Sequence, residues 1–214
     1  LPRVDGPLVI AIDEADRAIG SAWQEDFYGA LRDWDGNRAR LNKKERWGRV
    51  GLALVIATDP KMLIESGYTS PFNVTVPVTL GGFARAALDK FNESYRQMLS
   101  TAELDRLYGL LNGHPYLTPP AFYRLIWEDV TFSALCENAA KDSGPFGDHL
   151  RAKLDGVNNA HLREAMREIV FKGTVPANDR SLFYRLEAAG LAREDAGRIV
   201  ASNELYKLFF QAYL

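Results

Sequence analysis

The chain has few cysteines, few histidines and a small net charge, and each of these features excludes a class of protein. Cys136 is the single cysteine among 214 residues, so no internal disulfide can form. Its apolar surroundings predict a buried thiol rather than a nucleophile. The three histidines, His114, His149 and His161, lie far apart and lack the flanking cysteines or carboxylates of a zinc site. The 26 basic and 28 acidic residues leave a formal net charge of -2, which provides no overall attraction to nucleic acid or to anionic lipid.

Long apolar runs and targeting signals are also missing. No window approaches the roughly 18 consecutive apolar residues that a membrane helix needs, and the first residues lack the pattern of a secretory signal. No Gly-x-Ser-x-Gly elbow occurs, which disfavours a serine hydrolase. A composition of 47% apolar and 25% charged residues is typical of globular chains. These features predict a globular protein of the cytoplasm without a membrane segment.

Two short apolar runs predict the strands of a parallel sheet. Residues 8–12 (LVIAI) and 52–57 (LALVIA) are unbroken, and each run is followed by polar residues. Such runs are typical of strands that are buried on both faces. Between them, the apolar spacing of residues 22–34 predicts a helix with Ser21 as its N-cap, and the polar residues 35–49 predict a loop.

The polar residues after the two runs carry the first chemical signal. An apolar run followed by Asp13 and Glu14 has the Walker B pattern of nucleoside triphosphatases. In that pattern the first carboxylate orients the water shell of Mg²⁺, and the second polarises an attacking water. Thr58, after the second run, occupies the position from which such enzymes read the γ-phosphate. The alternative is structural, because any buried strand ends in polar residues and acidic residues also favour the start of a helix.

Gly113, His114 and Pro115 form the second candidate site. Glycine lets a backbone approach a ligand closely, and the flat apolar ring of proline can lie against a base. We therefore expect Gly113 and Pro115 to contact an adenine. The alternative is that the same residues end one helix and begin the next.

Beyond residue 83 the apolar spacing becomes helical. A third extended stretch, over residues 74–80, is stopped by a pair of glycines before this change. Ser100 and Glu103 predict a capping box at the start of one helix. Thr118, followed by a proline, and Thr131 predict two further helix starts.

The last sixty residues have the pattern of a separate small unit. Helices are expected near residues 161–171 and 179–189, followed by a short hairpin and a final helix. The hairpin strands, residues 191–193 and 198–200, flank a turn at 194–197 in which Gly197 supplies a positive φ. Helices followed by a β-hairpin predict a winged-helix module.

Taken in order, the motifs of this chain resemble those of a bacterial AAA-like domain family related to the STAND signalling ATPases. The resemblance covers essentially the whole chain. The motifs that carry it are Asp13-Glu14-x-Asp16-Arg17, Asp26-Phe27-Tyr28-x-x-Leu31-Arg32, Thr58-Asp59, Ser70-Pro71-Phe72-Asn73-Val74, Gly113-His114-Pro115-Tyr116-Leu117, Gly144-Pro145-Phe146-x-x-His149-Leu150, Leu186-Glu187-x-x-Gly190-Leu191 and Asn203-Glu204-Leu205-Tyr206.

The resemblance implies an α/β fold in three parts. Residues 1–83 would be the carboxyl-terminal part of a parallel P-loop-type (ASCE) core, residues 84–154 a helical lid, and residues 155–214 the winged helix. It also implies ATP or ADP with Mg²⁺ as ligands, bound through Asp13, Thr58, Gly113 and Pro115, with Glu14 as the catalytic residue. Members are usually embedded in larger regulatory proteins, so attached sensor or effector domains and a second copy of the chain are the expected partners.

One element of that family pattern is missing. No Gly-x-x-x-x-Gly-Lys-Ser/Thr phosphate loop occurs anywhere in the chain. We therefore expect an upstream P-loop half of the same domain as a further partner. We expect neither tight nucleotide binding nor ATP hydrolysis by this chain alone.

Two classes of function follow from these patterns. The first is a nucleotide-dependent regulatory switch within a larger STAND-like ATPase. The second is a nucleic-acid-binding module that uses the winged helix and the basic residues of segment 38–49. The near-neutral helix 179–189 suits an intramolecular contact better than a phosphate backbone, and segment 38–49 can equally be a solvated loop. The switch is therefore favoured.

Overall fold

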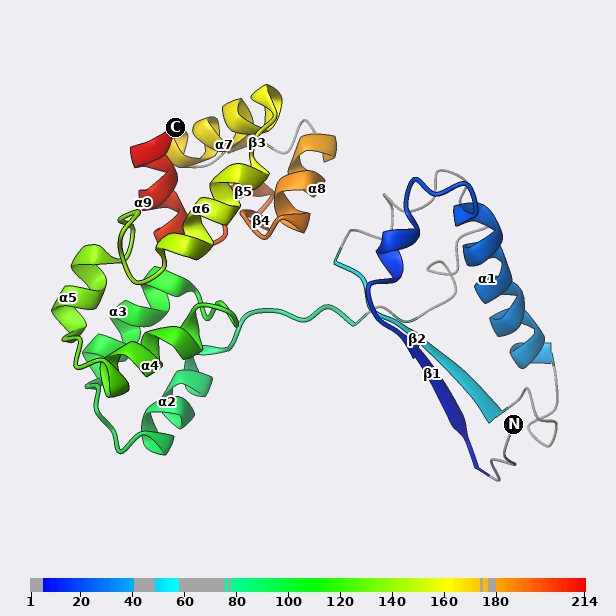
Figure 1. The fold of residues 1–214 in the computed structure, drawn as a ribbon, viewed down its shortest axis with the longest axis horizontal. Coiled ribbons are helices and arrows are strands. Elements are labelled where there is room, and N and C mark those ends of the chain that lie inside the picture. Colours follow the sequence, from blue (N-terminus) through cyan, green and yellow to red (C-terminus); the bar gives the residue numbers. More distant parts are fainter. Residues whose placement is uncertain (1–5, 41–48, 58–75, 77, 174, 177–179) are drawn as a thin grey trace. The chain divides into compact units, whose positions relative to one another are not determined.

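The chain forms two compact units, each with a hydrophobic cluster of its own (Figure 1). The computed structural model describes residues 6–40, 49–57, 76, 78–173, 175–176 and 180–214. The first unit spans Leu1–Thr79 and the second spans Leu80–Leu214. Both α-helices and β-strands are present in each unit, so the protein belongs to the mixed α/β class.

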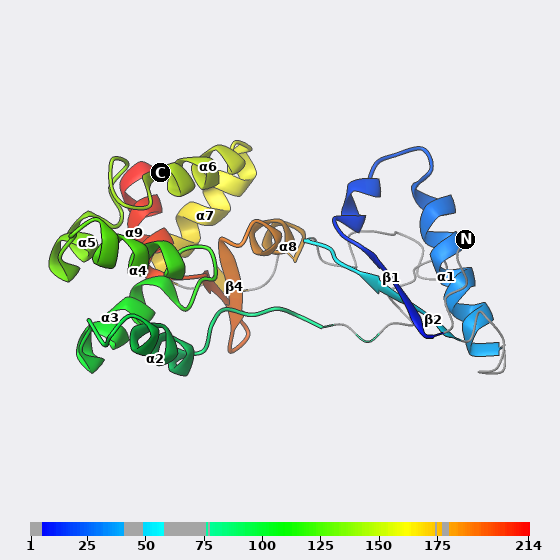
Figure 2. The same cartoon turned by 60° about the horizontal axis from the view of Figure 1, so that its bottom comes forward.

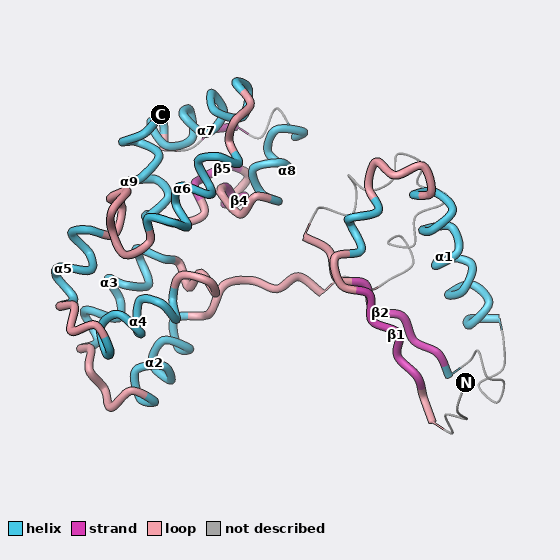
Figure 3. Tube along the Cα trace, viewed as in Figure 1, coloured by secondary structure: helices cyan, strands magenta, loops and turns pink. Residues whose placement is uncertain are grey.

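The first unit contains a pair of parallel strands (Figure 3). Strand β1 (Leu8–Ile12) pairs in register with β2 (Val50–Leu54), so that Leu8 lies opposite Val50 and Ile12 lies opposite Leu54. Between them lie a short 3-10 helix, η1 (Ala15–Ala18), and helix α1 (Gln24–Arg40). The predicted order of strand, helix and parallel strand is therefore confirmed, and the carboxyl ends of both strands meet at one edge. The second strand was expected over residues 52–57 but begins at Val50 and ends at Leu54.

Helix α1 covers only one face of this strand pair. Tyr28 and Leu31 of α1 are buried with Ala18, and Ile12 and Leu54 pack against them. On the strands, Val9 is 67% exposed, so the prediction that the strands are buried on both faces is wrong for the described part of the chain. A parallel strand is covered on both faces only where a layer packs on each side of the sheet.

The limits of α1 also differ from the prediction. The helix begins at Gln24 and continues to Arg40, so the first residues of the expected loop are helical. Ser21 is not at its N-cap, because it lies three residues before Gln24, and the Ser21 hydroxyl donates to the carbonyl of Ala18 in the preceding turn, at 2.7 Å. Gly36 costs a helix only about 1 kcal/mol, and nothing else between Trp34 and Arg40 prevents helical backbone.

The expected strand over residues 74–80 is not formed at the described positions 76 and 78–80. Val76, Val78 and Leu80 are more than 80% exposed there. A β-branched stretch becomes a strand only when a neighbouring strand pairs with it. Among the described residues, no strand pairs with positions 76 and 78–80.

The second unit is mainly helical (Figure 2). A single hydrophobic cluster extends through it, and the last helix in the chain contacts several of the others. None of the described helices is long and apolar enough to cross a membrane. The elements are α2 (Arg85–Ser94), α3 (Thr101–Leu111), α4 (Thr118–Trp127), α5 (Phe132–Asn138), α6 (Gly147–Gly156), α7 (Ala160–Lys172), β3 (Val175–Pro176), α8 (Arg180–Ala188), β4 (Ala192–Asp195), β5 (Arg198–Ala201) and α9 (Glu204–Tyr213).

Local capping chemistry starts several of these helices. Ser100 and Glu103 form both hydrogen bonds of the predicted capping box at the start of α3. Thr131 caps α5 by accepting the N–H of Ala134, as predicted. At α4 the prediction is one residue out, because the carbonyl of His114 accepts the N–H groups of both Leu117 and Thr118 and Thr118 is already helical.

The predicted hairpin is present and has a third strand beside it. Strands β4 and β5 are antiparallel and are joined by Ala196 and Gly197, both with positive φ. This two-residue turn is tighter than the predicted one, since its φ values match the twist of the flanking strands. Strand β3 pairs with the other side of β5 and was not predicted, because its two residues are too few for a periodic pattern.

Candidate functional site

Asp13 and Glu14 lie directly after β1, at the carboxyl edge of the strand pair. The side chain of Asp13 accepts the backbone N–H of Glu14 at 2.9 Å. Glu14 has φ 51° and ψ 39°, a left-handed conformation that non-glycine residues adopt only when their surroundings enforce it. Its carboxylate forms an ion pair with Arg17 at 2.7 Å, and its side chain is 59% exposed. The edge thus presents two carboxylates on a constrained backbone.

Hydrogen bonds hold this edge to the end of β2. Val55 donates to the carbonyl of Ile12 at 2.9 Å, and Ala15 donates to the carbonyl of Val55 at 3.0 Å. The N–H of Ala57 donates to a carboxylate oxygen of Asp16 at 3.2 Å. The backbone after β2 is therefore fixed beside the carboxylates up to residue 57, whereas Thr58 lies outside the described residues.

The fully buried Tyr28 secures the same edge from α1. Its hydroxyl donates to the carbonyl of Ala15 at 2.8 Å. Burial, with a smaller contribution from Asp16, raises the pKa of this phenol, so the hydroxyl keeps its proton. The turn after Glu14 is thus anchored to the core of the unit.

The arrangement suits Mg²⁺ bound through water rather than a complete metal cage. Among the described residues, no group of three histidine, cysteine or acidic side chains could hold a metal ion. Mg²⁺ is commonly held by one or two carboxylates, several waters and the phosphates of a substrate. A single exposed carboxylate at a strand end, such as Asp13, fits that requirement.

The Gly-x-Pro turn lies in the second unit, between α3 and α4. Asn112 ends α3 with φ 50°, and Gly113 follows with φ 62°. A Cβ on Gly113 would lie 2.0 Å from the carbonyl oxygen of Phe83, and the N–H of Phe83 donates to the carbonyl of Gly113 at 2.7 Å. Only glycine fits here, because both the positive φ and the close backbone approach exclude a side chain.

The rest of this turn faces outward. Pro115 is exposed, and Tyr116 is 65% exposed. The ring of His114 is half-buried, and its Nδ1 accepts the backbone N–H of Tyr116 at 3.2 Å. The flat face of Pro115 is therefore available to a ligand. The turn also joins α3 to α4, so its geometry is compatible with both interpretations of the motif, contact with an adenine and a connection between two helices.

The structure brings two of the three histidines together around one tyrosine. The hydroxyl of Tyr206, on α9, lies 3.1 Å from Nε2 of His114 and 2.7 Å from Nε2 of His149, on α6. Tyr206 is fully buried, and the ring of Tyr116 stacks on that of His149 with 4.9 Å between centroids. We call the side chains of His114, His149 and Tyr206 the Tyr206 junction. The sequence analysis gave neither His149 nor Tyr206 a functional role, although each of the three residues lies in a motif of the family pattern.

The hydrogen bonds of the Tyr206 junction determine where its protons lie. Because Nδ1 of His114 accepts a hydrogen bond, its Nε2 carries the proton and donates to the Tyr206 oxygen. The Tyr206 hydroxyl then donates to Nε2 of His149, which leaves the His149 proton on Nδ1. The chain of donors runs in one direction, from the Gly-x-Pro turn to α6.

Burial keeps all three groups neutral. It lowers the pKa of His149 to about 4, with smaller contributions from the charges of Lys153 and His114. Burial also lowers the pKa of His114, and Lys153 adds to the effect. The pKa of Tyr206 is raised above its ordinary value, again by burial. At neutral pH the junction therefore consists of two neutral imidazoles and one phenol.

Further contacts join helices α3 and α6 to the end of the chain. The side chain of Asn112 donates to the carbonyl of Ser202 at 2.9 Å. Lys153 donates to the carbonyl of Ala189, after α8, at 2.6 Å. Burial lowers the pKa of this lysine. These bonds hold the Gly-x-Pro turn, α6 and the hairpin segment in one arrangement.

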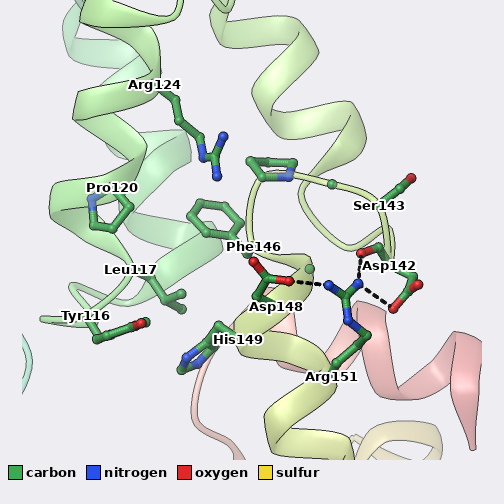
Figure 4. A pocket seen from close by; sticks show the side chains of 13 residues that line it. Tyr116, Leu117, Pro120, Arg124, Asp142, Ser143, Phe146, Asp148, His149 and Arg151 are labelled. Carbon is green, nitrogen blue, oxygen red and sulfur yellow. Dashed lines mark hydrogen bonds and ion pairs between the residues drawn. The ribbon is translucent and has the colours of Figure 1, made fainter.

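A cavity of about 370 Å³ lies beside the junction (Figure 4). Tyr116, Pro120 and Arg124 line it from the turn and α4, and Phe146 and His149 line it from α6 and the preceding loop. The loop is compact because a Cβ on Gly144 or on Gly147 would lie 1.9 Å from a backbone oxygen. Arg151 forms ion pairs with both Asp142 and Asp148, which joins the two ends of this loop.

Comparison with known proteins places these features in a family. The chain is 23% identical over 239 residues to an uncharacterized WD repeat-containing protein of Synechocystis sp. (strain ATCC 27184 / PCC 6803 / Kazusa), an alignment that covers 97% of this chain. The chain spans 19% of the length of that relative. A family model described as AAA-like domain matches residues 1–212. The chain therefore belongs to the AAA-like domain family.

Proposed function

We propose that this chain is the nucleotide-responsive part of a larger STAND-like ATPase, in which bound ATP or ADP determines the conformation of the helical unit. Membership of the AAA-like domain family indicates nucleotide binding in general. The Synechocystis relative carries WD repeats and is about five times as long as the match, which supports an attached sensor domain in this protein as well.

The observation that carries the proposal is the parallel pairing of β1 and β2. It brings Asp13, Glu14 and the residues after β2 to one edge of the sheet. In open parallel sheets, ligands bind at the carboxyl ends of the strands. The pair of strands would be part of a P-loop-type (ASCE) sheet, completed by a strand and phosphate loop that precede this chain.

Each residue at the edge has a specific task in this proposal. Asp13 would orient the waters of Mg²⁺, which in turn neutralises charge on the phosphates. Glu14 would polarise the attacking water, after its carboxylate leaves Arg17. Thr58 would contact the γ-phosphate. Because the phosphate loop is not in this sequence, tight binding and hydrolysis are expected only in the longer protein.

The second unit would respond to the nucleotide. In this proposal α2 to α6, within residues 84–154, form the helical lid, and α7 to α9 with the β3–β5–β4 sheet, within residues 155–214, form the winged helix. Gly113 and Pro115 would hold the adenine, since their turn is rigid and presents an exposed proline ring. The helices on either side of the turn would then follow the nucleotide.

The test uses the full-length protein and the variant Glu14→Gln. Glutamine keeps the shape of the side chain and removes the carboxylate that activates water, so ADP and ATP affinity should stay within about twofold while hydrolysis falls at least tenfold. Glu25→Gln, an exposed acidic residue in the first turn of α1, is the matched control and should hydrolyse ATP normally. Absence of nucleotide binding by the wild type, or equal turnover by Glu14→Gln, would refute the assignment.

A further inference from the structure

The Tyr206 junction links three separate elements through one hydroxyl group. We propose that Tyr206 is the positioning residue through which a change in the Gly-x-Pro turn reaches α6 and α9. The inference rests on the proposed function, because it requires that the turn contact the nucleotide. It adds the route by which that contact is transmitted and the residue on which transmission depends.

A backbone hydrogen bond of the turn fixes the orientation of His114 in the junction. The N–H of Tyr116, the residue after Pro115, donates to Nδ1 of His114. This bond holds the His114 proton on Nε2 and aims it at Tyr206. A ligand that shifts the backbone at Pro115 therefore alters the bond that fixes the His114 proton.

Tyr206 has no freedom to absorb such a change. The residue is fully buried, its N–H donates to Asn203 at the start of α9, and α9 packs against α3, α6 and α7. Its hydroxyl forms hydrogen bonds with His114 and His149, and the buried side chain of Asn203 also lies close enough to act on the phenol. If His114 no longer donates, the Tyr206 oxygen loses that hydrogen bond while the buried ring stays fixed, so only the O–H group can reorient, and its bond to His149 changes.

In this proposal His149 is the residue at which the change arrives. It lies in the first turn of α6 and stacks on Tyr116. Because it accepts the Tyr206 proton, it is held as the Nδ1-protonated form, the less common form of a free imidazole. When the Tyr206 hydroxyl turns away, His149 returns to a mixture of forms. The proton position on His149 therefore reports the state of a turn on another element.

The first experiment tests transmission without any nucleotide, in the 214-residue chain. Long-range ¹H–¹⁵N NMR distinguishes protonation on Nδ1 from protonation on Nε2 in each histidine. We expect His114 protonated on Nε2 and His149 on Nδ1 in the wild type. Pro115→Ala frees the turn and should shift the His149 signals toward the mixed form. In a Tyr206→Phe background the same Pro115→Ala change should leave the His149 signals unchanged.

Tyr213→Phe is the matched control for this cycle. Tyr213 lies on the same helix, and its hydroxyl accepts the N–H of Asp142 at 3.3 Å rather than contacting a histidine. In the Tyr213→Phe background the response of His149 to Pro115→Ala should persist. A His149 that ignores Pro115→Ala in the wild type, or responds equally with and without the Tyr206 hydroxyl, would overturn the inference.

The second experiment measures ADP affinity in the full-length protein. Tyr206→Phe should weaken ADP binding about three- to tenfold, because the turn is no longer held, while Tyr213→Phe should bind as the wild type does. If the wild type itself does not bind ADP, the proposed function fails and the NMR cycle still decides whether the junction transmits. If the wild type binds ADP and Tyr206→Phe binds it equally well, the positioning role is refuted.

Discussion

Gly113→Ala should be among the most damaging single changes in the helical unit. Alanine at φ 62° carries the cost of left-handed backbone, about 1 to 2 kcal/mol. Its Cβ would lie 2.0 Å from the Phe83 oxygen, far inside an ordinary contact, so the two backbones must separate by more than 1 Å. That separation breaks the 2.7 Å hydrogen bond from Phe83 to Gly113, worth about 1 kcal/mol. With the lost packing around the turn, the total is about 3 to 5 kcal/mol.

Gly109→Ala supplies the control in the same helix pair. A Cβ at Gly109, inside α3, meets nothing within 4 Å and has ordinary helical φ. Replacing it should therefore stabilise the unit by about 0.5 to 1 kcal/mol. Urea unfolding followed by circular dichroism at 222 nm measures both changes. A loss below about 1 kcal/mol for Gly113→Ala would show that the turn accommodates a side chain and that the close-approach argument is wrong.

Three further predictions concern single contacts. Ser100→Ala removes the capping box of α3 and should lower the unfolding free energy by about 1 kcal/mol, measured by urea titration; an unchanged midpoint would contradict the cap. Thr118→Val removes a buried hydroxyl that has no hydrogen-bond partner among the described residues. The unfolding free energy should therefore stay unchanged or rise by about 1 kcal/mol. A loss above about 1 kcal/mol in the urea titration would mean that the hydroxyl is hydrogen-bonded. The pKa of His149 is lowered from 6.5 to about 4 in the folded chain. As the pH falls, this imidazole is therefore protonated in the unfolded chain before it is protonated in the folded chain, which favours unfolding. The stability that is present above pH 6.5 should decline between pH 6.5 and 4. Partial exposure reduces this loss to about 1 to 2 kcal/mol, and thermal unfolding of His149→Gln across that range should show a shallower decline than the wild type.

Local features of the fold follow from short stretches of sequence. The capping box at Ser100, the cap at Thr131 and the turn at Gly197 were all predictable, because each depends on residues within about four positions of one another. The parallel pairing of β1 and β2 was also predictable from two apolar runs separated by a helix. These elements place Asp13 and Glu14 at a strand end with no information from the rest of the chain.

Predictions failed where the outcome depended on neighbours. Val9 is exposed and residues 76 and 78–80 form no strand, because burial and pairing require a second layer or strand that a sequence pattern does not supply. Helix α1 extended beyond its predicted end because Gly36 is too weak a signal to stop a helix by itself. Pairing with β5 likewise determined that the two residues of β3 form a strand.

The sequence by itself determined the motif at Gly113 to Pro115 and the histidines at 114 and 149, and glycine at position 113 permits the positive φ that the turn adopts. Only the tertiary structure decided that these residues meet at Tyr206. The hydroxyl of Tyr206 bonds to side chains 92 and 57 residues away in sequence, and no periodic pattern encodes contacts at such separations. They form because the apolar faces of α3, α6 and α9 pack into one cluster, and that packing places the buried hydroxyl of Tyr206 within reach of both imidazoles.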